Sequence, residues 1–236
     1  FLWFLFYSFC GWVYESILVS ILERRPVNRG FLNGPLCPIY GAGAVGAVVV
    51  LGQVHNPLVV FLLSMVGASI LEYVTSWVME ALFHARWWDY SQRKFNLNGR
   101  VCANTLIPFG LLGLVMVYFL KPLVFGWFDA LSETALYALS GSLAALLLTD
   151  TVISTTVLGR IRKNTSLSEK DDTEAITKSV RETLARDSAL VRRTLRAFPY
   201  AKLYNGKALE KARAARAKLK ADLKQAQLKA RADIDA

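Results

Sequence analysis

Three acidic residues lie inside otherwise apolar stretches of this 236-residue sequence: Glu15, Glu72 and Asp150. A carboxylate in the hydrocarbon part of a membrane costs roughly 2.5–3.5 kcal/mol, so such side chains face the protein interior and there bind protons, cations or hydrogen-bond donors. Glu15 and Glu72 each precede a second glutamate by eight residues, and Asp150 precedes Arg160 by ten. At a rise of about 1.5 Å per helical residue, the three acids reach similar depths. We therefore expect them to line one shared site, with the alternative that they only hold helices together.

The cations expected to reach these acids are Arg24, Arg25 and Arg100, unless a bound ligand supplies the charge. Other polar and aromatic residues lie in the connections at the same depth. The predicted substrate-binding residues are Glu15, Glu72, Asp150, Asn33, Asn98, Arg100, Trp88 and Asp89. The sequence has no nucleophile–base pair, no HExxH motif and no CxxC zinc spacing. We therefore predict no catalytic residue, no metal site and no cofactor, and a protein that is not an enzyme is favoured.

Five apolar segments can position these side chains. Hydrophobic residues make up 54% of the chain, and an apolar helix needs about 20 residues to cross a membrane. The predicted transmembrane helices are about 1–22, 36–54, 58–83, 105–125 and 134–158. The predicted fold is all-α, with a polytopic transmembrane domain at 1–159 and a cytoplasmic tail at 160–236. The first segment is long enough to span, so we expect it to be a helix of the protein rather than a cleaved signal peptide.

Positive charges alternate from one connection to the next. The loops after the first and third segments carry Arg24, Arg25, Arg29, Arg86, Arg93, Lys94 and Arg100. The loop after the second segment carries no Lys or Arg, and the one after the fourth carries only Lys121. Since basic residues mark the cytoplasmic side, this pattern predicts a plasma-membrane protein with its N-terminus outside and its C-terminus in the cytoplasm.

The sequence also contains an internal similarity. Residues 32–37, Leu-Asn-Gly-Pro-Leu-Cys, resemble residues 97–102, Leu-Asn-Gly-Arg-Val-Cys, and both stretches precede an apolar segment that contains glycine. Two spans in each unit would give both copies the same orientation. We therefore predict a parallel two-helix repeat about an axis along the membrane normal, with chance similarity as the alternative.

The third loop, residues 84–104, combines Trp87, Trp88 and Tyr90 with arginine and lysine, the composition of a membrane interface. One interpretation places this loop on the cytoplasmic headgroup layer, and another makes it partly re-entrant. In both, the Asn-Gly pairs at 33–34 and 98–99 form tight turns, because glycine permits positive φ and close backbone approach.

The whole net charge of +10 lies in the last third of the chain. A helix start at Ser168 and a second helix at about 207–232 predict a helical tail. Its charge predicts salt-sensitive contact with anionic lipid headgroups rather than nucleic acid, with a solvated tail as the alternative.

The run from Phe31 to Gly41, together with Leu71-Glu72-Tyr73, Trp87-Trp88-Asp89-Tyr90-Ser91 and 96–102, resembles the bacterial family of type IV ABC-transporter permeases, the CmpB-like group. The resemblance covers about residues 1–160. It implies a permease, and because the sequence has no GxxxxGK[ST] loop, a separate subunit would carry the ATPase. The small size also suggests a homo-oligomer.

Three functions are therefore considered. The first is a transport component that binds a small solute or lipid-like molecule between the acids, with proton coupling as an option. The second is a membrane enzyme acting on a lipid headgroup. The third is a scaffold or accessory subunit with a lipid-sensing tail.

Overall fold

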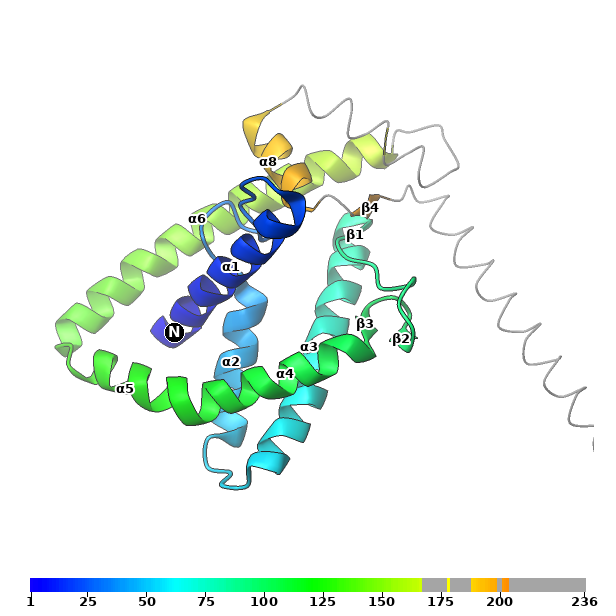
Figure 1. Cartoon of the computed structure of the whole chain (residues 1–236). Helices are drawn as coiled ribbons and strands as arrows, with labels where there is room; N and C mark the ends of the chain where they lie inside the picture. The colour runs from blue at the N-terminus through cyan, green and yellow to red at the C-terminus, as the bar shows by residue number, and fades with distance from the viewer. Residues whose placement is uncertain (167–177, 179–187, 199–200, 204–236) are drawn as a thin grey trace, which may run out of the picture.

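The computed structural model describes residues 1–166, 178, 188–198 and 201–203 and is mostly helical (Figure 1). The helices are α1 Leu2–Glu23, α2 Pro38–Leu51, α3 Pro57–Phe83, α4 Ala103–Leu114, the π-helix η1 Val115–Leu120, α5 Lys121–Asp129, α6 Glu133–Ser166 and α8 Ala189–Ala197. The strands are β1 Ala85–Arg86, β2 Asn96–Leu97, β3 Val101–Cys102 and β4 Lys202–Leu203. The predicted tail helices near Ser168 and at 207–232 lie outside the described residues.

Four helical stretches of the described chain are long and apolar enough to cross a membrane: Leu2–Glu23, Pro57–Phe83, Ala103–Phe128 and Glu133–Lys163. The predicted span 36–54 is shortened to α2, whose 14 residues measure about 21 Å against a hydrocarbon core of about 30 Å. Cys37 is extended because the residue before a proline avoids helical geometry. A multi-pass, largely helical membrane protein is therefore confirmed, whereas the count of five spans is not.

Glycines bring neighbouring helices into close contact. α1 packs against α2, α2 also packs against α3, and α3 packs against α4. A Cβ on Gly41 of α2 would collide with Ser8 of α1, and one on Gly113 of α4 would collide with Ser64 of α3. Close backbone approach of this kind holds membrane helices together through van der Waals packing, because lipid supplies no hydrophobic driving force.

The helical stretch Ala103–Phe128, which corresponds to the predicted fourth segment and is called the fourth span below, changes from α-helix to π-helix in its middle. Residues 115–120 form the π-helix between α4 and α5, just before Pro122, whose ring nitrogen cannot donate a helical hydrogen bond. The hydroxyl of Tyr118 then donates to the Val54 carbonyl at 3.0 Å, and Lys121 Nζ donates to the Gly52 carbonyl at 2.8 Å. These bonds satisfy carbonyls at the end of α2 and tie the second loop to the fourth span.

At the opposite end, part of the sequence beyond residue 160 packs onto the helices (Figure 1). α6 continues past residue 159, and α8 lies against it. β4 pairs antiparallel with β1 of the third loop, Ala85 opposite Leu203 and Arg86 opposite Lys202. Buried side chains from the third loop, α6 and residues 191–198 and 201–203 form one core: Ala85, Trp87, Val157, Leu158, Ile161, Val191, Leu195, Ala197, Phe198, Ala201 and Leu203. Residues 188–198 and 201–203, here called the docked segment, therefore pack as part of the helical domain.

Candidate functional site

Glu15, in the middle of α1, has both carboxylate oxygens occupied. Its Oε1 accepts a hydrogen bond of 2.6 Å from the hydroxyl of Tyr40 on α2, and Arg29 Nε lies 3.3 Å from its Oε2. The expected cations Arg24 and Arg25 do not take this place, and Arg25 pairs instead with Glu23 at 3.4 Å. Arg29 is therefore the residue that compensates the charge of Glu15, because the first loop turns back over α1.

Arg29 also joins the first loop to the docked segment. Its Nη1 donates to the carbonyl oxygen of Ala197, and its guanidinium lies 4.6 Å from the centre of the Phe198 ring. Arg193 of α8 donates to the Gly30 carbonyl at 3.1 Å. Since Arg29 contacts both Glu15 and α8, the position of the docked segment is linked to the surroundings of that acid.

Glu72 of α3 lies in a different environment. The residue is buried, with 8% of its surface exposed, and the hydroxyl of Tyr90 donates to its Oε1 at 3.2 Å. Its Oε2 is buried and has no hydrogen-bond partner among the described residues. Glu15 lies within electrostatic reach of both Glu72 and Tyr90. Burial, followed by the nearby carboxylates of Glu72 and Glu15, raises the pKa of Tyr90 above its ordinary value.

Asp150 of α6 binds the first loop rather than the other two acids. Its Oδ1 accepts from the backbone N–H of Asn33 at 3.0 Å, and its Oδ2 accepts from that of Gly34 at 2.8 Å. The Asn33 amide and the Ser154 hydroxyl each donate to Oδ1 at 3.2 Å. Four donors therefore satisfy this carboxylate, and it fastens the first Asn-Gly pair to α6.

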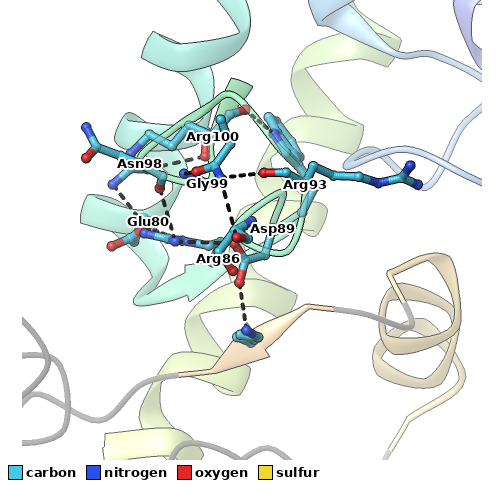
Figure 2. Close-up of polar contacts among 12 residues, drawn as sticks. Glu80, Arg86, Asp89, Arg93, Asn98, Gly99 and Arg100 are labelled. Atoms are coloured by element: carbon cyan, nitrogen blue, oxygen red, sulfur yellow. Dashed lines mark hydrogen bonds and ion pairs between the residues drawn. The ribbon is translucent and has the colours of Figure 1, made fainter. Parts of the chain in front are cut away.

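A second group of charges surrounds Glu80 at the end of α3, and we call Glu80, Arg86, Asp89 and Arg100 the buried charge cluster (Figure 2). Glu80 Oε2 lies 2.9 Å from Arg86 Nη2 and 3.0 Å from Arg100 Nη2. Both arginines and Glu80 are buried. The expected partner Arg100 is thus directed to Glu80, and its Nη1 donates to Ser76 at 3.2 Å. Two cations on one carboxylate leave positive charge that Asp89 offsets, 3.6 Å from Arg86.

Asp89 links this cluster to the docked segment, since Lys202 Nζ lies 2.6 Å from its Oδ2. Burial by itself would raise the pKa of Asp89, but hydrogen bonds from Lys202 and from the Ser91 backbone N–H outweigh it and lower the pKa below its ordinary value. Nearby, the Trp88 indole N–H donates to the Arg100 carbonyl at 3.0 Å. Trp87 is buried against Phe198, with ring centroids 4.7 Å apart, so this tryptophan packs within the protein.

The two Asn-Gly pairs behave differently. Asn98 and Gly99 both have positive φ, 54° and 70°, and turn the hairpin formed by β2 and β3, as predicted. The Asn98 amide donates to the Tyr73 hydroxyl at 3.0 Å. Asn33 and Gly34 do not have positive φ, and they aim their N–H groups at Asp150 instead. Similar sequences thus adopt different turns: the N–H groups of the first pair donate to the Asp150 carboxylate, whereas the Gly99 N–H donates to the side-chain oxygen of Asn96 within the hairpin.

The two halves of the predicted repeat carry similar residues at matching sequence positions, but these residues make different contacts. Cys37 and Cys102 each directly precede the returning helix, and both thiols are buried. Arg29 and Arg86 are separated by the same number of residues as Glu15 and Glu72. Arg29, however, pairs with Glu15, whereas Arg86 pairs with Glu80. The parallel repeat stays a prediction.

The structure thus brings Asp89, Asn98, Trp88 and Arg100 into one network and pairs Asp150 with Asn33, while Glu15 and Glu72 lie within electrostatic reach of each other and share no direct contact among the interactions described. Five polar partners of these acids were not predicted from the sequence: Arg29, Tyr40, Arg86, Tyr90 and Lys202. Arg29 and Arg86 could have been found from the sequence, because they are separated by the same number of residues as Glu15 and Glu72. The tyrosines and Lys202 carry no such signal, since only folding brings them to the acids.

Comparison with known proteins gives one assignment. The model of the family described as "Putative ABC-transporter type IV" matches residues 2–155. No curated protein and no solved structure matches the chain.

Proposed function

Because the chain belongs to the type IV ABC-transporter family whose model covers residues 2–155, we propose that it is the membrane component of a transporter and binds its solute beside Glu15 and Glu72. The solute is small or lipid-like and carries a positive charge or exchanges with protons. The family points to an ATPase as a separate partner, which would drive the movement of the solute.

The proposal depends on a difference between the two acids in how many of their carboxylate oxygens have partners. Glu15 and Glu72 come from different helices and lie within electrostatic reach of each other. Arg29 and Tyr40 occupy both oxygens of Glu15, while Glu72 keeps one buried oxygen without a partner in the described part of the chain. A buried carboxylate that only holds helices together normally has its lone pairs satisfied, and even the partly buried Asp150 has donors on both oxygens. Glu72 is therefore the residue that we assign to a ligand.

The buried charge cluster and the docked segment would form the cytoplasmic face of this site. The first loop, the third loop and the docked segment meet at one end through Arg29, Arg193 and the β1–β4 pairing. These segments also carry much of the positive charge that marks the cytoplasmic side. We propose that this end faces the cytoplasm, where it can contact an ATPase subunit and anionic lipid, and that Asn33, Asn98, Arg100, Trp88, Asp89 and Asp150 shape the entrance.

The experiment compares membrane vesicles with and without the protein, loaded with ATP or with a non-hydrolysable analogue, for uptake of a set of labelled cationic and lipid-like solutes. Glu72→Gln keeps the shape of the side chain but cannot ionise. We expect ATP-dependent uptake of at least one solute, lost in Glu72→Gln at unchanged membrane abundance and kept in the control Thr149→Ala, whose side chain is exposed on α6. Equal uptake in wild type and Glu72→Gln would contradict the proposal. Chemical conversion of a lipid headgroup would favour the enzyme alternative, and normal uptake without the chain would favour the scaffold.

A further inference from the structure

We propose that Glu72 is a proton-binding site and that the neutral carboxylic acid, with its proton on Oε2, is the form present in the structure. This inference deepens the proposed transport function and rests on it for its physiological role, but the proton itself can be detected without any solute.

Glu72 has no compensating cation among the described residues. Glu72 is 8% exposed, and the groups that face it are the Tyr90 hydroxyl from the third loop and the Glu15 carboxylate from α1. Tyr90 in turn faces Cys102 at the start of α4. None of these is positive. An isolated ionised carboxylate in such surroundings is costly, and a neighbouring carboxylate increases that cost.

The nearby arginines pair with other groups. Arg100 is held by Glu80 and by Ser76, one helical turn from Glu72. Arg86, which corresponds in spacing to the arginine that neutralises Glu15, is held by Glu80 and Asp89. The first copy of the predicted repeat thus carries an arginine on its acid, and the second copy lacks one. A proton would supply the missing positive charge.

The surroundings of Glu72 fit a proton better than a metal cation. A metal cation needs several oxygen ligands at once. Here the tyrosine hydroxyl already donates to Oε1, and the carboxylate leaves a single buried oxygen, Oε2, without a partner in the described chain. A proton needs no other ligand, and protonation turns that oxygen into a hydroxyl. On this basis Glu72 binds one proton on Oε2, which makes the carboxyl group neutral in its buried position.

The test is infrared spectroscopy of the full chain in lipid nanodiscs at neutral pH, with protons as the only ligand. A protonated buried carboxyl gives a separate C=O stretching band that shifts in D2O. We expect this band in the wild type, complete loss of it in Glu72→Gln, and its retention in Asp150→Asn, which removes the satisfied acid. Tyr90→Phe removes the hydrogen bond to Oε1 and should move the band to higher frequency without removing it, so the assignment can be checked even if Glu72→Gln fails to fold.

Three results would overturn the inference: no such band in the wild type, an unchanged band in folded Glu72→Gln, or a wild-type band that disappears on addition of sodium at constant pH, which would make the site one for a metal cation. A band that behaves as expected in a protein that moves no solute would instead contradict the proposed function and leave the proton site standing. Circular dichroism of each variant establishes that the helices are intact.

Discussion

Lys202 lies with its ammonium 2.6 Å from Oδ2 of Asp89, although the two residues are more than a hundred positions apart. Asp89 belongs to the third loop and Lys202 to β4, so this ion pair and the neighbouring β1–β4 pairing fasten the docked segment to the buried charge cluster. The Asp89 side chain is 8% exposed and that of Lys202 is 43% exposed. The pair is therefore half accessible to solvent and can be weakened without unfolding the helices.

Asp89→Asn should loosen the docked segment. The substitution removes the charge that faces Lys202 and Arg86, and because solvent screens Lys202 we expect a loss of about 1 kcal/mol, or about a fivefold increase in local opening. Hydrogen exchange of the amides of residues 201–203 measures this local opening, since opening exposes these amides to solvent. Lys202→Arg keeps the charge and serves as the control. Unchanged exchange in Asp89→Asn would show that the apolar core alone holds the segment.

The same pair predicts a pH dependence. The pKa of Asp89 is lowered on folding from its ordinary value of 3.8, so the unfolded form binds protons more readily. Its contribution to docking should therefore be complete above about pH 4 and disappear as the pH falls through the lowered pKa. We expect amide exchange at residues 201–203 to be steady from pH 7 to about pH 4, after correction for the intrinsic exchange rate, and to rise below that. Asp89→Asn should remove this acid-dependent step, and an equal step in the variant would assign it to another group.

Asp150→Ala should destabilise the attachment of the first loop to α6. It leaves the partly buried N–H groups of Asn33 and Gly34 without their acceptor, and because water can reach them in part, the cost for each lies toward the lower end of the about 1–3 kcal/mol of a fully buried group. Asp150→Asn keeps one acceptor oxygen and should cost less. Thermal unfolding in nanodiscs ranks the stabilities of wild type, Asp150→Asn and Asp150→Ala. The control is Thr149→Ala, an exposed position one residue earlier on α6. If Asp150→Ala unfolds like the control, the loop does not depend on this carboxylate.

Gly41→Ala should disturb the packing of α1 on α2. The added methyl group would collide with Ser8 and with the Phe4 backbone, and overpacking of this kind costs about 1–3 kcal/mol. Gly46→Ala on the same helix is the matched control, because a Cβ there meets nothing within 4 Å. A lower unfolding temperature for Gly41→Ala than for Gly46→Ala is the expected outcome, and equal temperatures would mean that the two helices can separate freely.

The predicted orientation can be checked by cysteine labelling. A cysteine at Asn56, in the loop between α2 and α3, should react with an impermeant reagent from outside the cell, and one at Ser168 only from inside. The background chain carries Cys10→Ser, since Cys10 is partly exposed while the other two thiols are buried. Reaction of both positions from the same side would rule out an odd number of spans between them, and with it the proposed five-span topology.

The membrane class, the main apolar helices and the presence of costly acids within them could be predicted from the sequence, whereas the similar depth of these acids stays a prediction. These features depend on composition and on local spacing, which the bilayer constrains directly through its thickness and its lack of hydrogen-bond partners. The turn at Asn98-Gly99 is local in the same sense, because the preference of these residues for positive φ does not depend on distant contacts.

The pairing of the charges was decided only by the tertiary structure. Arg29 rather than Arg24 or Arg25 reaches Glu15, and Arg100 turns to Glu80 rather than to Glu72. Lys202, far along the chain, completes the cluster around Asp89. Long side chains such as arginine and lysine can reach several acids at nearly equal sequence distance. Which one they meet depends on how loops and helices from remote parts of the chain pack, since burial makes the energy of each ion pair depend on its whole surroundings.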